Sequence, residues 1–198
     1  TALDELSTLY NSAKNHPRAL ELAQRTLEIH ERIKGADNPG GGYLVARMAR
    51  ELSRLQPGAA EAMFRRAEPL VKASPNVSDW PELLVYWAWH ELDRGNPTQA
   101  EHYAQQSWEL SRAAAARSRQ GEANPRIAHS LIGIGDVYSG LGKLTEAESA
   151  YTQALQIFDA VRGGDYHWVG ESRQRLAEVY RRRQAFEQAR TQAQAAVE

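Results

Sequence analysis

The chain has 198 residues, 42% of them hydrophobic and 25% charged, with 24 Lys and Arg, 25 Asp and Glu, and no cysteine. A net charge of −1 gives no global field that attracts nucleic acid or an anionic membrane, so neither is expected as a partner. The lack of cysteine excludes a disulfide framework, a thiolate nucleophile and a cysteine-ligated metal. No stretch approaches about 18 uncharged apolar residues, so we expect no membrane insertion. The compartment stays open, with the cytoplasm favoured over the periplasm.

Motifs for catalysis or cofactor binding are lacking. The six histidines include no pair at helical spacing that could start a metal site, and there is no G-x-S-x-G elbow. The glycine-rich stretch Ile132–Lys143 is no phosphate loop, because Val137 and Leu144 replace the first glycine and the hydroxyl residue of a Walker A motif. We therefore expect a non-enzyme with no catalytic residues, no metal and no cofactor.

Five alanines recur in a similar helical context along the chain, with spacings of 41, 40, 47 and 42 residues. They are Ala19, Ala60, Ala100, Ala147 and Ala189. Small or apolar residues follow each alanine at four and seven positions, which marks one stripe of a helix, and a second amphipathic segment precedes it. The repeated unit is therefore a pair of helices. The predicted units span residues 1–36, 37–76, 77–120, 124–164 and 165–198, in one array that we expect to be part of a longer protein.

The first two-thirds of the chain match the repeat only in its register and its small-residue pattern, so the units there are divergent. In the second and third units, the match improves if the turn between the two helices is one residue shorter than in the other units. Trp87 and Trp89 belong to a tryptophan-rich segment of the third unit, and residues two apart cannot share one helix face. We expect these tryptophans to fill interfaces between helices, with one of them partly exposed; an aromatic ligand pocket is the alternative. Residues 112–120 are expected to extend the third unit's second helix.

The fourth unit, IGIGDVYSGLGKLTEAESAYTQAL at Ile132–Leu155, resembles the tetratricopeptide repeat. The family's small residue, aromatic residue and turn glycine in and after the first helix match Gly135, Tyr138 and Gly142, and the alanine, aromatic and alanine of the second helix match Ala147, Tyr151 and Ala154. The 42-residue period and linkers such as GADNP resemble kinesin-light-chain-type repeats, a subclass abundant in bacteria, so a bacterial origin is expected. The resemblance implies an all-α, right-handed superhelix of about five helix pairs with a concave groove.

The fifth unit concentrates five arginines in Arg173–Gln184. This segment is either a solvated face balanced by Glu171 and Glu178, or a clamp for an acidic peptide or phosphate. Near the end of the chain, the apolar residues Ala195, Ala196 and Val197 leave self-association through the terminal helices open.

The family resemblance implies that the first helix of each unit lines the groove. Transferred by register, the predicted groove residues are Asp4, Thr8, Asn11, Arg50, Tyr86, His90, Asp93, Asp136, Gln174, Glu178 and Arg181. Such residues three or four positions apart lie one above another on a helix. The groove asparagines typical of kinesin light chains are replaced, so we do not expect kinesin-like cargo. The mixed charges favour a partner with both charges and an apolar anchor.

The sequence thus predicts a non-catalytic scaffold that binds a protein or peptide segment in its groove. The alternative is a regulatory module that senses a signalling peptide or small ligand and controls an attached kinase or transcription-factor domain.

Overall fold

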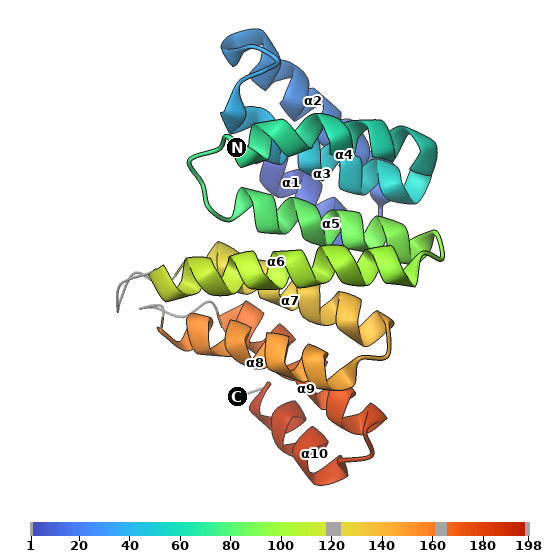
Figure 1. Ribbon diagram of the computed structural model, residues 1–198, viewed down its shortest axis with the longest axis vertical. Coiled ribbons are helices and arrows are strands. Elements are labelled where there is room, and N and C mark those ends of the chain that lie inside the picture. The colour runs from blue at the N-terminus through green and yellow to red at the C-terminus, as the bar shows by residue number, and fades with distance from the viewer. Residues whose placement is uncertain (1, 118–123, 161–165, 197–198) are drawn as a thin grey trace.

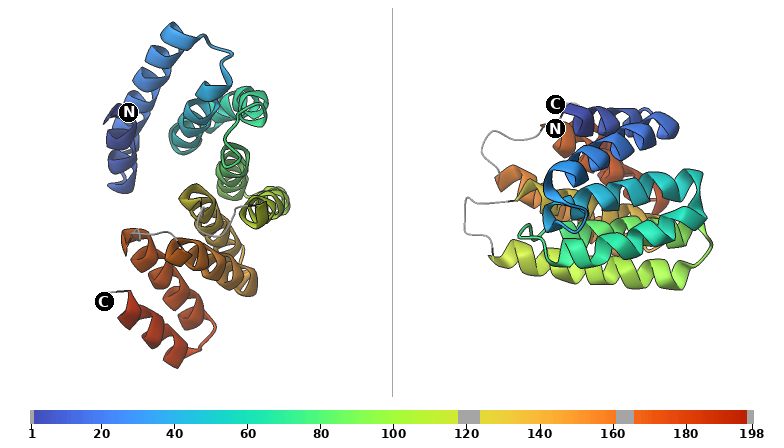
Figure 2. Two further views of the ribbon diagram at one scale, coloured as in Figure 1. Left: turned by 90° about the vertical axis from the view of Figure 1, so that its left-hand side faces the viewer. Right: turned by 90° about the horizontal axis from the view of Figure 1, so that it is seen from above.

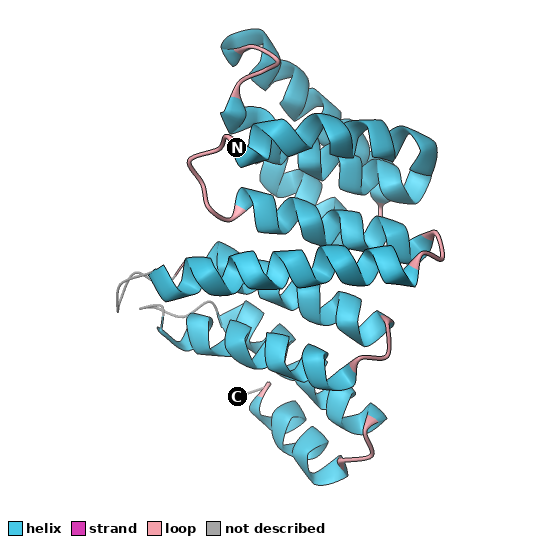
Figure 3. Cartoon of the chain, viewed as in Figure 1, coloured by secondary structure: helices cyan, strands magenta, loops and turns pink. Residues whose placement is uncertain are grey.

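The computed structural model describes residues 2–117, 124–160 and 166–196, and these ranges contain ten α-helices, one short 3₁₀ helix and no strand. The elements are α1 (Ala2–Ser12), α2 (His16–Lys34), η1 (Pro39–Gly41), α3 (Gly42–Leu55), α4 (Pro57–Lys72), α5 (Asp79–Asp93), α6 (Pro97–Arg117), α7 (Pro125–Gly140), α8 (Leu144–Ala160), α9 (Tyr166–Arg182) and α10 (Phe186–Ala195). Figure 3 shows that the described residues are helices joined by turns and loops. The predicted extension of α6 is confirmed as far as Arg117, and residues 118–120 lie outside the described ranges.

Consecutive helices form pairs, and the pairs stack along the long axis of the molecule (Figure 1). Each second helix also packs against the first helix of the next pair. Turned by 90°, the stack is a C-shaped arc with α3, α5 and α7 on its inner side and α4 and α6 on its outer side (Figure 2). The predicted all-α solenoid is confirmed, and its inner face is built from the first helices of the units.

The turn within each pair fixes the register of the repeat. Four of the five turns place one residue in the left-handed region, with φ values of 58°, 77°, 76° and 60° at Lys14, Gly95, Gly142 and Gln184. The amide of the next residue donates to the carbonyl five positions earlier, as from Asn96 to Glu91 at 2.8 Å. Only in the second pair is the turn shorter, with Gln56 alone between α3 and α4. The shorter turn is therefore confirmed for the second unit and wrong for the third.

The fourth pair is held by a small residue facing a large ring. A Cβ atom added at Gly135 would lie 2.5 Å from the ring of Tyr151, so any side chain at this position would force the ring or the helix to shift. Gly133, which has no counterpart in the family pattern, allows a second close approach, because an added Cβ would lie 2.6 Å from a methyl group of Val85 on α5. Both glycines pack α7 against its neighbours, and α7 continues through them to Gly140 with no phosphate loop.

The middle of the array is held by stacked aromatic rings. Trp87 is 8% exposed and lies between Phe64, at 5.4 Å and 11°, and Tyr103, at 4.9 Å and 20°. This stack ties α5 to α4 and α6. Trp89 lies on another face of α5 and is half-buried. The prediction that one of the two tryptophans is partly exposed is confirmed.

Candidate partner-binding groove

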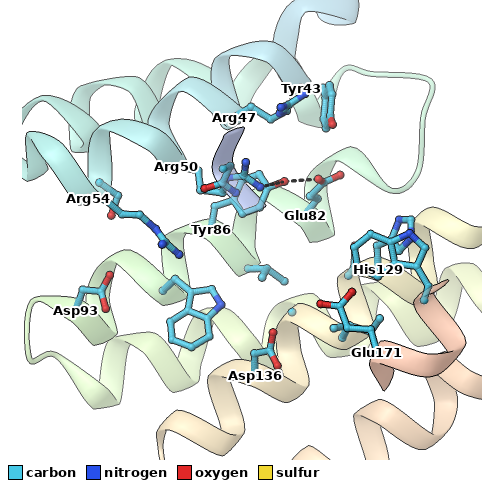
Figure 4. A pocket seen from close by; sticks show the side chains of 18 of the residues that line it. Tyr43, Arg47, Arg50, Arg54, Glu82, Tyr86, Asp93, His129, Asp136 and Glu171 are labelled. Atoms are coloured by element: carbon cyan, nitrogen blue, oxygen red, sulfur yellow. Dashed lines mark hydrogen bonds between the residues drawn. The ribbon is translucent and has the colours of Figure 1, made fainter. Parts of the chain in front are cut away.

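The inner face of the arc holds a pocket of about 480 Å³ (Figure 4). Its lining comes almost entirely from the first helices of the second to fifth pairs. The lining residues are Tyr43, Arg47, Arg50, Ser53 and Arg54 of α3; Glu82, Val85, Tyr86, Trp89 and Asp93 of α5; His129, Ser130, Ile132, Gly133 and Asp136 of α7; Trp168, Glu171 and Arg175 of α9; and Asn11 of α1. Within each helix these residues recur at spacings of three and four, which place them on one face. The pocket therefore presents four parallel rows of side chains.

The row on α3 meets the row on α5 through Arg50. Its guanidinium lies 2.6 Å from Glu51 and stacks over the Tyr86 ring, with its Cζ atom 5.0 Å from the ring centre. The Tyr86 hydroxyl donates to Glu82. Burial, and then the charge of Glu82, raises the pKa of Tyr86 well above its usual value, so the phenol stays a hydrogen-bond donor. Although burial opposes the charge of Arg50, Tyr86 and Glu51 hold its pKa above the usual value.

Arg126 connects α5 to α7. Its Nη2 atom lies 3.0 Å from Glu82 and 2.9 Å from Asp79, and its Cζ atom lies 4.6 Å from the centre of the Tyr43 ring. Asp79 is 5% exposed, so its charge needs this partner. One guanidinium thus forms ion pairs with two carboxylates at the start of α5 and reaches back to α3.

Asp136 connects α7 to α9. Its Oδ1 atom accepts from the Tyr151 hydroxyl at 2.7 Å and from Arg175 Nε at 2.7 Å, and Arg175 Nη1 lies 2.7 Å from Glu171. Burial and the charge of Asp136 raise the pKa of Tyr151, so this hydroxyl also remains a donor. Asp136 therefore positions the groove wall as well as lining it.

The first pair is joined to the second by a further polar cluster. Asn11 lies against Glu51, which is 1% exposed. When the side-chain amide of Asn11 is oriented so that both its nitrogen and its oxygen form hydrogen bonds, the oxygen accepts a hydrogen bond from Arg50 Nη2 at 3.0 Å. His16 Nε2 lies 3.2 Å from Arg54 Nη1. Every neighbouring pair of units is thus tied by polar contacts on the inner face.

The arginine-rich segment of α9 is largely engaged within the chain. Arg175 pairs with Glu171, Arg181 lies 2.6 Å from Glu178, and Arg182 donates to the Ser139 hydroxyl at 2.7 Å. Arg183 pairs with Glu148. These contacts favour the interpretation of a face balanced by carboxylates over that of a clamp.

The structure brings some of the predicted groove residues together and separates others. Asn11, Arg50, Tyr86, Asp93 and Asp136 line the pocket. In contrast, Gln174, Glu178 and Arg181 line a shallow depression between α9 and α10. Asp4 and Thr8 lie on α1, and their side chains are outside the described part of the structure.

The prediction that His90 lines the groove is wrong. This side chain is 1% exposed, packs on Phe64 at 5.3 Å between ring centres, and lies 2.8 Å from the Ser53 hydroxyl through Nδ1. The cause is the register of the third unit. Its full-length turn makes Ala88 the small residue of the helix crossing, so Trp89 moves onto the groove face and His90 moves off it.

Sequence reasoning missed one whole layer of the groove. Tyr43, Glu82, His129 and Glu171 occupy equivalent positions, six residues before the small residue of each first helix, and all line the pocket. The repeat register could have found this layer, because it lies one to two turns before the transferred family positions on the same face.

Within the described ranges, no group of three or more His, Asp or Glu side chains could hold a metal ion, and no helix is long and apolar enough to cross a membrane. The fold defines an α-solenoid of stacked helix pairs with a pocket on its concave face. Tetratricopeptide repeat profiles match residues 1–40 and 126–198, together more than half of the chain. The chain belongs to the tetratricopeptide repeat family.

Several solved structures share the fold. TPR-like repeats of a Podosopora anserina protein named as a kinesin light chain match 98% of this chain and 93% of their own, with 17% identity and a TM-score of 0.61. A Rap protein complexed with Competence and Sporulation Factor gives a TM-score of 0.73 at 14% identity, over 98% of this chain and 52% of that one. NprR in complex with its cognate peptide NprX gives a TM-score of 0.62 at 16% identity, over 98% of this chain and 54% of that one. Comparison with curated protein sequences gives no match.

Proposed function

We propose that the protein is a non-catalytic scaffold that binds a segment of a partner protein in the groove formed by α3, α5, α7 and α9. The observation that carries this proposal is the pocket on the inner face, where arginine, carboxylate and aromatic side chains from four helices converge. Its volume of about 480 Å³ is within the range of specific ligand sites and suits a few residues of a partner.

The groove is preorganised for this role. The Tyr86 and Tyr151 hydroxyls, Arg50 and Arg175 are already held by contacts within the chain, so a ligand does not have to order them. The half-buried Trp89 offers an aromatic surface to an apolar side chain of the partner.

A regulatory sensor is the second candidate. Two proteins that share the fold are found in complexes, the Rap protein with Competence and Sporulation Factor and NprR with its cognate peptide. In this chain the polar contacts across the inner face link each unit to the next, so a ligand that competes for Arg50 or Asp136 would alter the arc. Such a change would be measured as a shift in energy transfer between fluorophores on α2 and α8 when the ligand binds.

Self-association through the terminal helices is a third proposal. Leu9 on α1 and Phe186 on α10 are each 65% exposed, so both are accessible to a second copy of the chain. Ala195 and Ala196 are half-buried, and Val197 lies outside the described residues.

Site-directed photo-crosslinking in lysate of the source cell tests the groove proposal. A photoreactive phenylalanine analogue replaces Trp89 in the groove or, as a matched control, the exposed Arg65 on the outer helix α4. We expect a discrete set of proteins crosslinked from position 89 and not from position 65, identified by mass spectrometry. Equal capture at both positions, with unchanged helical circular dichroism, would contradict the proposal.

A further inference from the structure

Resting on the proposed function, we infer that the groove selects a segment with an acidic side chain and a basic side chain about three residues apart. The acidic side chain binds at Arg54 and the basic one at Asp93. An apolar side chain between them packs on Trp89.

The charges of the pocket are sorted by helix. Every charged residue that α3 contributes to the lining is an arginine, at positions 47, 50 and 54. The charged residues of α5 and α7 in the lining are all carboxylates, Glu82, Asp93 and Asp136. A partner segment that crosses the groove from α3 toward α7 therefore passes from a positive wall to a negative one.

Most of these charges already form ion pairs within the chain. Arg50 pairs with Glu51, Glu82 pairs with Arg126, and Asp136 pairs with Arg175. Such groups position the wall but have little charge left for a partner. Arg47 is only 3% exposed, so it is also poorly placed to receive one.

Arg54 and Asp93 are different, because both are exposed and lie at the same end of the pocket (Figure 4). The polar neighbour of Arg54 is His16, whose ring nitrogen lies 3.2 Å away and offers no full negative charge. Asp93, the last residue of α5, has no ion pair with any described residue of the chain. These two residues are therefore the charges that the groove leaves for a ligand.

An apolar surface adjoins this pair. Trp89 lies one turn before Asp93 on the same face of α5 and lines the pocket. Beside it Val85 and Gly133 pack closely, since an added Cβ at Gly133 would lie 2.6 Å from Val85. An apolar side chain of the partner segment can be buried against this surface while the neighbouring charged side chains reach Arg54 and Asp93.

The spacing follows from the helix packing. The helices α3 and α5 are in direct contact, and the axes of packed helices lie about 8–10 Å apart. A chain in polyproline II conformation rises about 3.1 Å per residue and repeats every three residues. An acid and a base three positions apart therefore point the same way and span this distance.

The test is a selection from a displayed library of random decapeptides, flanked on both sides by Gly/Ser linkers so that no free terminus contributes. Wild-type protein is compared with a groove swap, Arg54→Glu with Asp93→Lys. The matched control is a swap on the outer surface, Arg65→Glu with Glu61→Lys, an exposed pair on α4. A Trp89→Ala variant reports whether selected peptides occupy the groove, and circular dichroism checks the folding of each protein.

We expect peptides selected on wild type to be enriched in an acidic and a basic residue three positions apart. They bind the groove swap about tenfold more weakly, as two exposed pairs turned from attraction to repulsion predict. They bind the control swap unchanged. Exchanging the two charges in the peptide restores binding to the groove swap.

Two failures are distinguishable. Selected peptides that lose affinity for Trp89→Ala but bind the groove swap and wild type equally would overturn this inference and leave the proposed function standing. Peptides that bind Trp89→Ala as well as wild type, or a pool in which nothing is enriched, would overturn both.

Discussion

The α7/α8 pair and the region around α5 bring their helices together in two different ways. In the former, Gly135 lies under the ring of Tyr151, and no side chain separates the helix from that ring. In the latter, Phe64, Trp87 and Tyr103 stack at centroid distances of 5.4 and 4.9 Å. The first solution is the family pattern and the second is not, yet both support the same stacking of pairs. The repeat thus specifies register and small residues more strictly than it specifies what fills the interface.

The largest expected effect comes from removing the centre of the aromatic stack. Trp87→Ala deletes a buried ring with neighbours on both faces, and we expect the free energy of unfolding to fall by about 3–5 kcal/mol. Urea unfolding followed by far-ultraviolet circular dichroism measures it. Trp89→Ala is the matched control, since its half-buried ring should cost less than half as much. If both variants lost the same free energy of unfolding, the aromatic stack would not be the main stabilising contact of this region.

A smaller effect is expected where the small residue is enlarged. Gly135→Ala places a methyl group in contact with the buried Tyr151 ring, and overpacking of this kind costs about 1–3 kcal/mol. This exceeds or offsets the gain of about 1 kcal/mol from the better helix propensity of alanine. The same urea assay applies.

Two companion variants sharpen the result for Gly135. Gly58→Ala on α4 meets nothing within 4 Å and should be stabilising. Adding Tyr151→Leu to Gly135→Ala should recover part of the lost stability. If the Gly135→Ala protein were more stable than wild type, the Tyr151 ring would have moved aside without a measurable cost, contrary to this prediction.

Acid pH is expected to separate the two regions again. Burial lowers the pKa of His90, so the unfolded chain binds a proton more readily than the folded one. The stability that this group contributes is present above the ordinary histidine pKa near 6.5 and is lost as pH falls through the lowered value. Hydrogen exchange at pH 5 and pH 7.5, corrected for intrinsic rates, should show α4 and α5 opening more at low pH than α7 and α8. Replacing His90 by Gln should reduce this difference, and an unchanged difference would assign it to other groups.

The smallest effect concerns exposed apolar side chains on the first and last of the five helix pairs. Leu9→Glu and Phe186→Glu change exposed side chains, so stability should move by only about 0.5 kcal/mol. If the terminal helices mediate self-association, sedimentation velocity will show a larger monomer fraction for either variant than for wild type at equal concentration. A wild-type protein that is monomeric at high concentration would refute the proposal.

The fold was predictable because its determinants repeat along the chain. The recurrent alanines and the Gly135, Tyr138 and Gly142 pattern fix the helix pairs without any tertiary information. The error in the third unit arose because a bulky tryptophan was allowed in the position of a small residue. With Ala88 in that position, Trp89 falls in the groove and His90 in the core.

The site was predictable only in part. The helix face could be inferred from register, which correctly placed Arg50 and Asp136 in the pocket. Their partners could not, because the contacts join residues far apart in sequence, such as Arg126 and Glu82, 44 positions apart. Which charges remain for a ligand depends on these contacts, and no local pattern reveals it.

The ties across the inner face also bear on how the molecule bends. A curved rod that straightens lengthens its inner edge most, and on this edge Arg50, Arg126 and Arg175 each contact a side chain of a neighbouring unit. Opening the arc would stretch these contacts, so they resist opening more than closing. Because their strength is partly ionic, the elastic stiffness of the solenoid should decrease as salt concentration rises.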